Sequence, residues 1–130
     1  MRTFCKYGLG GYILVVVALS CAKPVPSFAV DVGADLYDQE CADCHSLAKP
    51  PKNKKGPSLV GIMGKPAAAV PNFAYSDALK LARIVWTAEK MDAYIENPKA
   101  LVSGGGKMKY DGLKNVAERT AIIEFLNRQQ

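Results

Sequence analysis

The chain has 130 residues, of which 49% are hydrophobic, and its formal net charge is +5 at neutral pH. This length accommodates one small domain and a targeting segment. Three of the 17 basic residues, Arg2, Lys6 and Lys23, lie in the first 29 positions, so the rest of the chain holds 14 basic residues against 12 acidic ones. A domain so close to neutral lacks the positive charge that nucleic-acid binding requires, and nucleic acid is not expected as a partner.

The start of the chain has the composition of a targeting segment. Arg2 and Lys6 form a basic start, residues 12–19 are mainly apolar, and the small residues Ser27 and Ala29 stand where a signal peptidase would cut. This pattern predicts a signal peptide over residues 1–29 that is removed before Val30.

Two other fates of this segment stay open. One is an uncleaved membrane anchor, although the apolar stretch is shorter than the roughly 20 residues that a membrane span needs. The other is lipidation at Cys21. An N-terminal export signal predicts that the domain, residues 30–130, lies in the bacterial periplasm, membrane-tethered if residues 1–29 are kept.

The most specific pattern in the chain is Cys41-Ala-Asp-Cys44-His45. Two thiols three positions apart, followed directly by an imidazole, form the attachment pattern of c-type haem. On one helical turn the two thiols can add to the vinyl groups of a haem as thioethers, and His45 is then placed to ligate the iron. The sequence therefore predicts one covalently bound haem c.

Other chemistries of cysteine and histidine fit this pattern less well. A structural zinc site needs four ligands, but the other cysteines, Cys5 and Cys21, lie in the predicted leader and His45 is the only histidine. A thioredoxin-like dithiol is expected within alternating strands and helices, a pattern that the sequence does not show. A plain disulfide leaves the adjacent histidine without a role.

The first and last predicted elements are helices that are expected to meet. Asp31 can cap a first helix that runs to about Ala42 and delivers the cysteines to the haem. Gly33 is costly in a helix unless another element crosses closely. Phe125, in a last helix over residues 115–127, is suited to lie against this glycine.

A long loop is predicted over residues 46–71, where prolines and glycines recur. An irregular stretch of this length is unusual in a small domain unless a bound group such as haem organises it. Within it, the carbonyl oxygen of Pro57 is placed to accept a hydrogen bond from the His45 ring and so to orient the ligand.

Two further helices are predicted, one that ends before Trp86 and one from Thr87 to Asn97, which a proline follows. Tyr75, Trp86 and Tyr94 have large rings that favour the core, and each also has a polar tip. We expect the tips of Tyr75 and Trp86 to reach a haem propionate. The tip of Tyr94 is expected near the axial-ligand region.

A methionine is expected as the second axial ligand of the iron. Met1 leaves with the leader, and Met91 fits the apolar face of its helix, which leaves Met63 and Met108 as candidates. Met63 lies in a glycine-rich loop. Met108 follows the glycines 104–106, which permit close approach of the backbone to a flat cofactor, and the position of its loop favours it over Met63.

Taken in order, these motifs resemble the class I cytochromes c, the group that includes mitochondrial cytochrome c and the small soluble periplasmic carriers of bacteria. The segments that carry the resemblance are Cys41-Ala-Asp-Cys44-His45, Gly56-Pro57-Ser-Leu59, Pro71-Asn-Phe73-Ala-Tyr75-Ser-Asp, Trp86, Tyr94-Ile-Glu-Asn97-Pro98-Lys99, Gly106-Lys107-Met108 and the C-terminal helix. The resemblance implies an all-α fold in which the N- and C-terminal helices cross and long loops wrap around one haem.

The same resemblance implies a set of haem contacts. It implies thioethers at Cys41 and Cys44 and iron ligation by His45 and Met108. By the same resemblance, the residues that support the site are Pro57 at the histidine and Tyr75 and Trp86 at the propionates.

An iron with two protein ligands has no vacancy for a substrate, which favours one-electron transfer over catalysis. We expect a monomeric electron carrier, not an enzyme, that accepts electrons from a quinol-oxidising cytochrome bc complex and donates them to a terminal oxidase or a photosynthetic reaction centre. Two alternatives stay open. One is a dedicated electron donor or acceptor of a periplasmic dehydrogenase, and the other is a haem-based peroxidase or ligand-binding domain.

Charge is unevenly distributed along the domain. Acidic residues crowd the first predicted helix, and lysines follow the haem motif and recur late in the chain. This asymmetry suits electrostatic steering toward acidic docking surfaces on membrane redox complexes. The lysines expected near the exposed haem edge are Lys52, Lys54, Lys55, Lys99, Lys107 and Lys109.

Overall fold

The protein is described by a computed structural model that covers residues 31–103 and 106–130. These residues form five α-helices: α1 (Val32–Glu40), α2 (Asp77–Leu81), α3 (Ala88–Glu96), α4 (Pro98–Leu101) and α5 (Val116–Asn127). Among them there is no strand, only an isolated antiparallel bridge between Pro66 and Val85. The predicted all-α fold is confirmed.

The predicted leader, residues 1–29, lies outside the described residues, and its fate stays a prediction. In the described part of the chain, none of the helices combines the length and the apolar character needed to cross a membrane.

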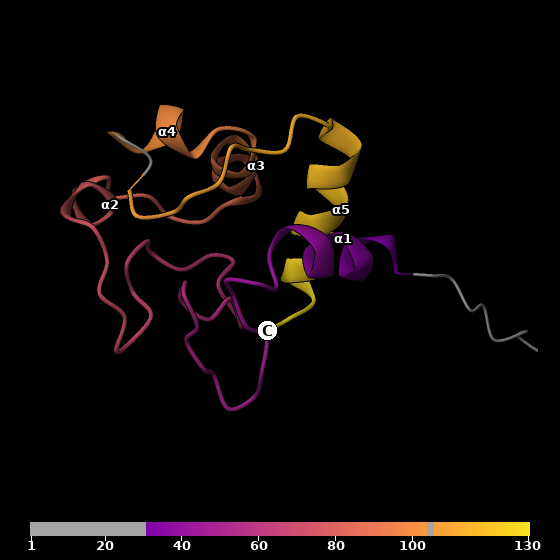
Figure 1. The fold of residues 1–130 in the computed structure, drawn as a ribbon, viewed down its shortest axis with the longest axis horizontal. Helices are drawn as coiled ribbons and strands as arrows, with labels where there is room; N and C mark the ends of the chain where they lie inside the picture. Colours follow the sequence, from indigo (N-terminus) through magenta and orange to yellow (C-terminus); the bar gives the residue numbers. More distant parts are fainter. Residues whose placement is uncertain (1–30, 104–105) are drawn as a thin grey trace, which may run out of the picture.

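The helices α1 and α5, from opposite ends of the described chain, cross beside each other, and α3 lies against α5 (Figure 1). The crossing is closest at Gly33, where a Cβ atom would overlap the carbonyl oxygen of Ala121 and lie 2.8 Å from the Cβ of Phe125. One turn further along α1, the ring of Tyr37 packs against that of Phe125 with 5.5 Å between centroids. The predicted contact between Gly33 and the last helix is confirmed.

The core lies where these helices meet the loops between them. α5 contributes Ile122 and Leu126 to the core, and both side chains are at most 1% exposed. The buried apolar residues of the core are Tyr37, Ile62, Ile84, Trp86, Met91, Tyr94, Ile95, Val102, Ile122, Ile123 and Leu126.

Polar caps begin the helices where the sequence predicts them. The Asp31 side chain accepts a hydrogen bond from the backbone N–H of Ala34, and the Thr87 hydroxyl accepts one from the N–H of Lys90. Each cap satisfies an amide that has no partner within its own helix. The cap at Asp31 fixes the residue at which α1 begins. It therefore sets how many helical residues precede Cys41.

α2 is the short helix that was predicted to end before Trp86. It ends at Leu81, and Arg83 then adopts a left-handed conformation with φ 49° and turns the chain toward the bridge at Val85. One element was not predicted. α4 is an additional short helix that begins at Pro98, where the missing N–H of proline costs no helical hydrogen bond. The same proline that ends α3 therefore starts α4.

We expect Gly33→Ala to lower the free energy of unfolding by about 1–3 kcal/mol, because the added methyl group has no room at the crossing. Intrinsic helix propensity alone would favour alanine by about 1 kcal/mol, so the sign of the effect is diagnostic. Denaturant unfolding followed by circular dichroism measures it. Asp38→Ala on the exposed side of α1 is the control, with an expected change below about 0.5 kcal/mol. A Gly33→Ala variant as stable as the parent would contradict the close crossing.

Candidate haem-binding site

The cysteine pair lies in a turn that directly follows α1. The N–H groups of Cys44 and His45 both donate to the carbonyl oxygen of Cys41, at 3.1 and 2.9 Å. α1 itself ends at Glu40, so the expected extension to about Ala42 is replaced by this turn. Cys41 is half-buried and packs against the core, whereas Cys44 is exposed.

The Cys41 thiol is poorly suited to redox chemistry of its own. Burial raises the pKa of Cys41 to about 12, and the neighbouring Glu40 and Cys44 act in the same direction. A reactive dithiol needs the opposite shift, toward a thiolate at neutral pH. Within residues 31–103 and 106–130 there is also no group of three or more histidine, cysteine or acidic residues that could hold a metal ion. The raised pKa of Cys41 therefore argues against the dithiol interpretation.

The His45 ring is held by the hydrogen bond that the sequence suggested, with Nδ1 lying 2.8 Å from the carbonyl oxygen of Pro57. A carbonyl oxygen can only accept, so Nδ1 carries the proton and Nε2 keeps its lone pair. Burial lowers the pKa of His45, the positive charge of Lys54 lowers it further, and the bond to Pro57 opposes both. The ring is thus placed as a neutral imidazole with Nε2 available to a metal.

Gly56 belongs to one of the motifs that carry the resemblance, but the sequence predicts no contact between this glycine and the histidine. A Cβ atom at this position would overlap Cε1 of His45 and lie 2.8 Å from its Nδ1. The N–H of Gly56 donates to the carbonyl oxygen of Cys44 at 2.7 Å, which draws this backbone against the attachment turn. Gly56 is not among the described residues with positive φ, so the need for glycine comes from the contact with the ring. In the sequence, Gly56 and Pro57 form a Gly-Pro pair, which predicts a loop but not a contact with the His45 ring.

The loop that carries Gly56 and Pro57 is fastened by its own side chains. Ser58, 2% exposed, donates through its hydroxyl to the carbonyl oxygen of Ser46. Asn53 accepts from the N–H of Ser58 at 2.9 Å and donates to the carbonyl oxygen of Pro71 at 3.0 Å. These bonds tie the loop to itself and to residue 71. They add to whatever order a bound haem gives the loop.

The two methionine candidates have similar surroundings. Met63 and Met108 are both half-buried and both pack against the core cluster, whereas Met91 is buried within it on α3, as its helical position predicts. Of the glycines that precede Met108, 104 and 105 lie outside the described residues. The choice of Met108 as the second axial ligand stays a prediction.

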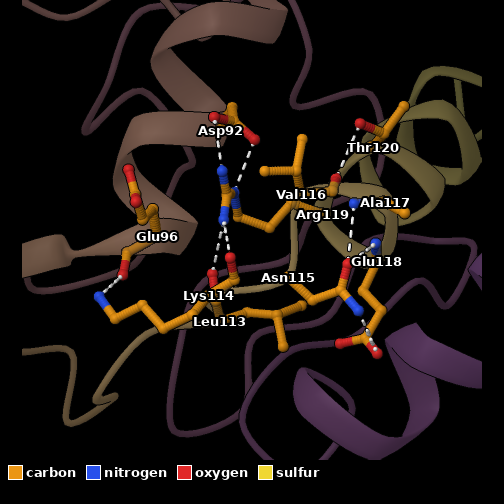
Figure 2. Close-up of polar contacts among 10 residues, drawn as sticks. All are labelled: Asp92, Glu96, Leu113, Lys114, Asn115, Val116, Ala117, Glu118, Arg119 and Thr120. Atoms are coloured by element: carbon orange, nitrogen blue, oxygen red, sulfur yellow. Dashed lines mark hydrogen bonds and ion pairs between the residues drawn. The ribbon is translucent and has the colours of Figure 1, made fainter.

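The chain beyond Met108 is anchored by a buried arginine (Figure 2). Arg119 of α5 is 3% exposed, and its Nε and Nη2 donate to the Asp92 carboxylate of α3 at 2.7 and 3.2 Å. Its Nη1 donates to the carbonyl oxygens of Leu113 and Lys114, both at 2.9 Å. The planar guanidinium satisfies all these acceptors at once, which a lysine could not do. It ties α3 and α5 to the end of the Met108 segment, by which we mean residues 106–114.

The three aromatic residues predicted to contact haem separate into two groups. Trp86 and Tyr94 are buried in the core and pack on each other, with 5.1 Å between ring centroids. Tyr75 is half-buried and lies edge-to-face on Phe73 at 4.8 Å. Burial raises the pKa values of both tyrosines, so their hydroxyls stay protonated and able to donate at neutral pH. Their bonds to haem groups stay predictions.

Together these residues form a donor set that fits a covalent haem. The attachment turn presents two unpaired thiols, the neutral His45 has a free lone pair on Nε2, and a thioether is half-buried against the core. Cys41 and both candidate methionines pack against the apolar core cluster, which offers the kind of surface that the face of a porphyrin needs.

Known proteins of similar sequence were found, although no protein-family model matches the chain. It is 40% identical to cytochrome c of Stellaria longipes over 94 residues, which cover 72% of this chain and 86% of the relative. It is 38% identical to cytochrome c of Cochliobolus lunatus over 97 residues, or 75% of this chain and 89% of the relative. Cytochrome c type-1 of Ascaris suum is 36% identical over 105 residues, or 81% and 92%.

The periplasmic location predicted from the sequence is wrong. The similar proteins are eukaryotic cytochromes c, which belong to the mitochondrial intermembrane space. The prediction rested on the composition of residues 1–29, and a basic and apolar leader does not by itself identify the compartment that receives the protein.

We expect Gly56→Ala to displace the His45 ring and to lower the free energy of unfolding of the holoprotein by about 1–3 kcal/mol. The measurement is denaturant unfolding, combined with the NMR shifts of the imidazole protons in the ferrous state. Ser103→Ala, at an exposed position, is the control and should leave both unchanged. Unaltered imidazole shifts in Gly56→Ala would show that the ring does not depend on this glycine.

Proposed function

The chain belongs to the class I cytochromes c, and from this we propose that it carries single electrons from a quinol-oxidising cytochrome bc complex to a terminal oxidase or a photosynthetic reaction centre. Proteins of this family are electron carriers rather than enzymes, and they hold one covalent haem c. When bound, the haem supplies one-electron chemistry between ferric and ferrous iron. The observation that carries the proposal is the hydrogen bond from His45 to Pro57, which leaves Nε2 for the iron.

In this proposal each residue of the site has a separate task. Cys41 and Cys44 would anchor the haem through thioethers, and Nε2 of His45 and the sulfur of Met108 would ligate its iron. Pro57 and Gly56 keep the imidazole in one orientation, the first by accepting from Nδ1 and the second by leaving no free space beside the ring. Ligands held in this way change little between redox states, which suits rapid electron transfer.

The aromatic residues complete the proposed pocket. Trp86 and Tyr94 offer buried ring surface to the haem, and their N–H and O–H groups, with that of Tyr75, are donors for its propionates and axial region. The side chains that exclude water around the iron are in this view the same ones that form the core of the protein.

The exposed Cys44 indicates where electrons would enter and leave. Because this thiol lies at the surface, a thioether at this position would bring one haem edge to solvent. The Nζ of Lys54 donates to the carbonyl oxygen of Ala42 at 2.6 Å, so its positive charge lies over the attachment turn. Lys109, next to Met108, is exposed as well. We assign this edge as the docking surface for the acidic faces of redox complexes.

The other lysines of the predicted docking group are also exposed, and some have local partners. The Nζ of Lys107 donates to the carbonyl oxygen of Ala74 at 2.8 Å, and that of Lys99 lies 3.8 Å from the Asp111 carboxylate. Exposed pairs of this kind contribute little to stability, so these charges remain available to a partner.

The choice between the two methionines is tested in the ferric holoprotein. We expect Met108→Ala to abolish the iron–thioether absorption band and to lower the reduction potential by on the order of 100 mV or more, because thioether ligation favours ferrous iron. Met63→Ala is the matched control and should keep both the band and the potential. Loss of the band in Met63→Ala alone would reverse the assignment.

The docking surface is tested by electron transfer to a purified terminal oxidase. We expect the second-order rate constant of the parent to fall as ionic strength rises, and Lys54→Gln and Lys109→Gln each to lower it about twofold to fivefold at low salt. Lys90→Gln, at an exposed position of α3, removes the same charge outside the proposed surface and should have a smaller effect. A rate that does not change with salt would rule out electrostatic steering.

A further inference from the structure

The segment that carries Met108 is tied to the rest of the protein by several elements. Lys107 bonds to the carbonyl oxygen of Ala74, and the N–H of Leu113 donates to that of Ile95 at 2.9 Å. A further tie, from the Tyr110 hydroxyl, reaches α1. This tie joins the segment that carries Met108 to the end of α1, next to the attachment turn, and these two parts of the chain would lie on opposite sides of the haem.

The geometry of this third tie is that of a strong hydrogen bond. The hydroxyl of Tyr110 lies 2.7 Å from Oε2 of Glu40, and a hydroxyl that donates to a carboxylate forms a charge-assisted bond. The ring of Tyr110 is half-buried and packs against the core, so the hydroxyl has a fixed starting point. Within residues 31–103 and 106–130, no cation forms an ion pair with Glu40.

The two partners stand next to the residues that matter for the iron. Glu40 is the last residue of α1 and directly precedes Cys41, and Tyr110 lies two positions after Met108. Residues 40 and 110 are 70 positions apart, so the bond fixes the ligand segment to the attachment turn across most of the domain.

From this juxtaposition we propose that Tyr110 and Glu40 are positioning residues for the sixth iron ligand: their hydrogen bond holds the Met108 segment closed against the attachment turn and slows the exchange of the thioether for an external ligand. The proposal rests on the assignment of Met108 made above. It concerns access to the iron, which the docking surface and the ligand set do not by themselves determine.

The size of the effect follows from the exposure of the carboxylate. A bond to a charged group is stronger than one between neutral groups, but Glu40 is exposed and water competes for it. We therefore expect loss of the bond to speed opening of the segment by roughly threefold to tenfold. The other ties of the segment would remain, so the protein stays folded and the band persists at rest.

The experiment measures opening directly by trapping the open iron of the ferric holoprotein with saturating imidazole. At saturation the rate of loss of the iron–thioether band equals the rate of opening. Tyr110→Phe keeps the ring and removes only the hydroxyl, and Glu40→Ala removes the acceptor. We expect both to accelerate opening by the same factor, and the double variant to be no faster than either.

Two further variants separate the hydrogen bond from general effects. Glu40→Gln keeps an acceptor oxygen but loses the negative charge, so its opening rate should lie between that of the parent and that of Glu40→Ala. Thr120→Ala removes an exposed hydroxyl that donates to the carbonyl oxygen of Val116 within α5, and should leave the rate unchanged. Faster amide exchange over residues 106–112 in Tyr110→Phe, but not in Thr120→Ala, would give independent support.

Defined outcomes overturn the proposal. A Tyr110→Phe protein with parental opening and amide exchange, additive effects in the double variant, or a Glu40→Gln protein as fast as Glu40→Ala would each refute it. These results differ from failure of the ligand assignment, in which the unmodified protein has no thioether band or keeps it in Met108→Ala.

Discussion

The contact between α1 and α5 at Gly33 is the constraint on which the rest of the structure depends. The backbone of α5 approaches α1 so closely that a Cβ atom cannot be accommodated, and the rings of Tyr37 and Phe125 extend the contact. α1 in turn ends at Glu40, immediately before the attachment turn. The position of α5 therefore determines where the two cysteines and His45 lie, although α5 contributes no residue to the ligand set.

The two proposed axial ligands are held by different means. Two backbone contacts confine the His45 ring. The Pro57 carbonyl oxygen accepts a hydrogen bond from Nδ1, and the Gly56 backbone occupies the space beside the ring. The Met108 segment is held by side chains from other elements, with Arg119 and Asp92 at its far end and Glu40 at its near end. Contacts with residues nearby in the sequence thus fix His45, whereas contacts with residues distant in the sequence fix the segment that carries Met108.

Sequence patterns predicted the parts of the protein that depend on neighbours in the chain. The haem motif and the caps at Asp31 and Thr87 follow from local spacing, and the bond from His45 to Pro57 joins residues only 12 positions apart. The all-α fold was implied by the resemblance to the class I cytochromes c. Gly56, Arg119 and the bond from Tyr110 to Glu40 were missed because their roles depend on residues that only the fold brings near. Arg119 did leave a trace, since it interrupts an apolar face formed by Ile122, Ile123 and Leu126. The left-handed turn at Arg83, which follows α2, has no such signal in the sequence.

The crossing of α1 and α5 also sets an order of events during synthesis. Asp31 and Arg128, which form an ion pair across this contact, are separated by 97 positions in the chain. Contacts between such distant residues form late, because a long loop must close before they are made. A nascent chain therefore exposes its attachment turn before the last helix exists to fix it. Once α5 has closed on α1, Cys41 is half-buried against the core while Cys44 stays exposed, so the two thiols then differ in their access to covalent chemistry.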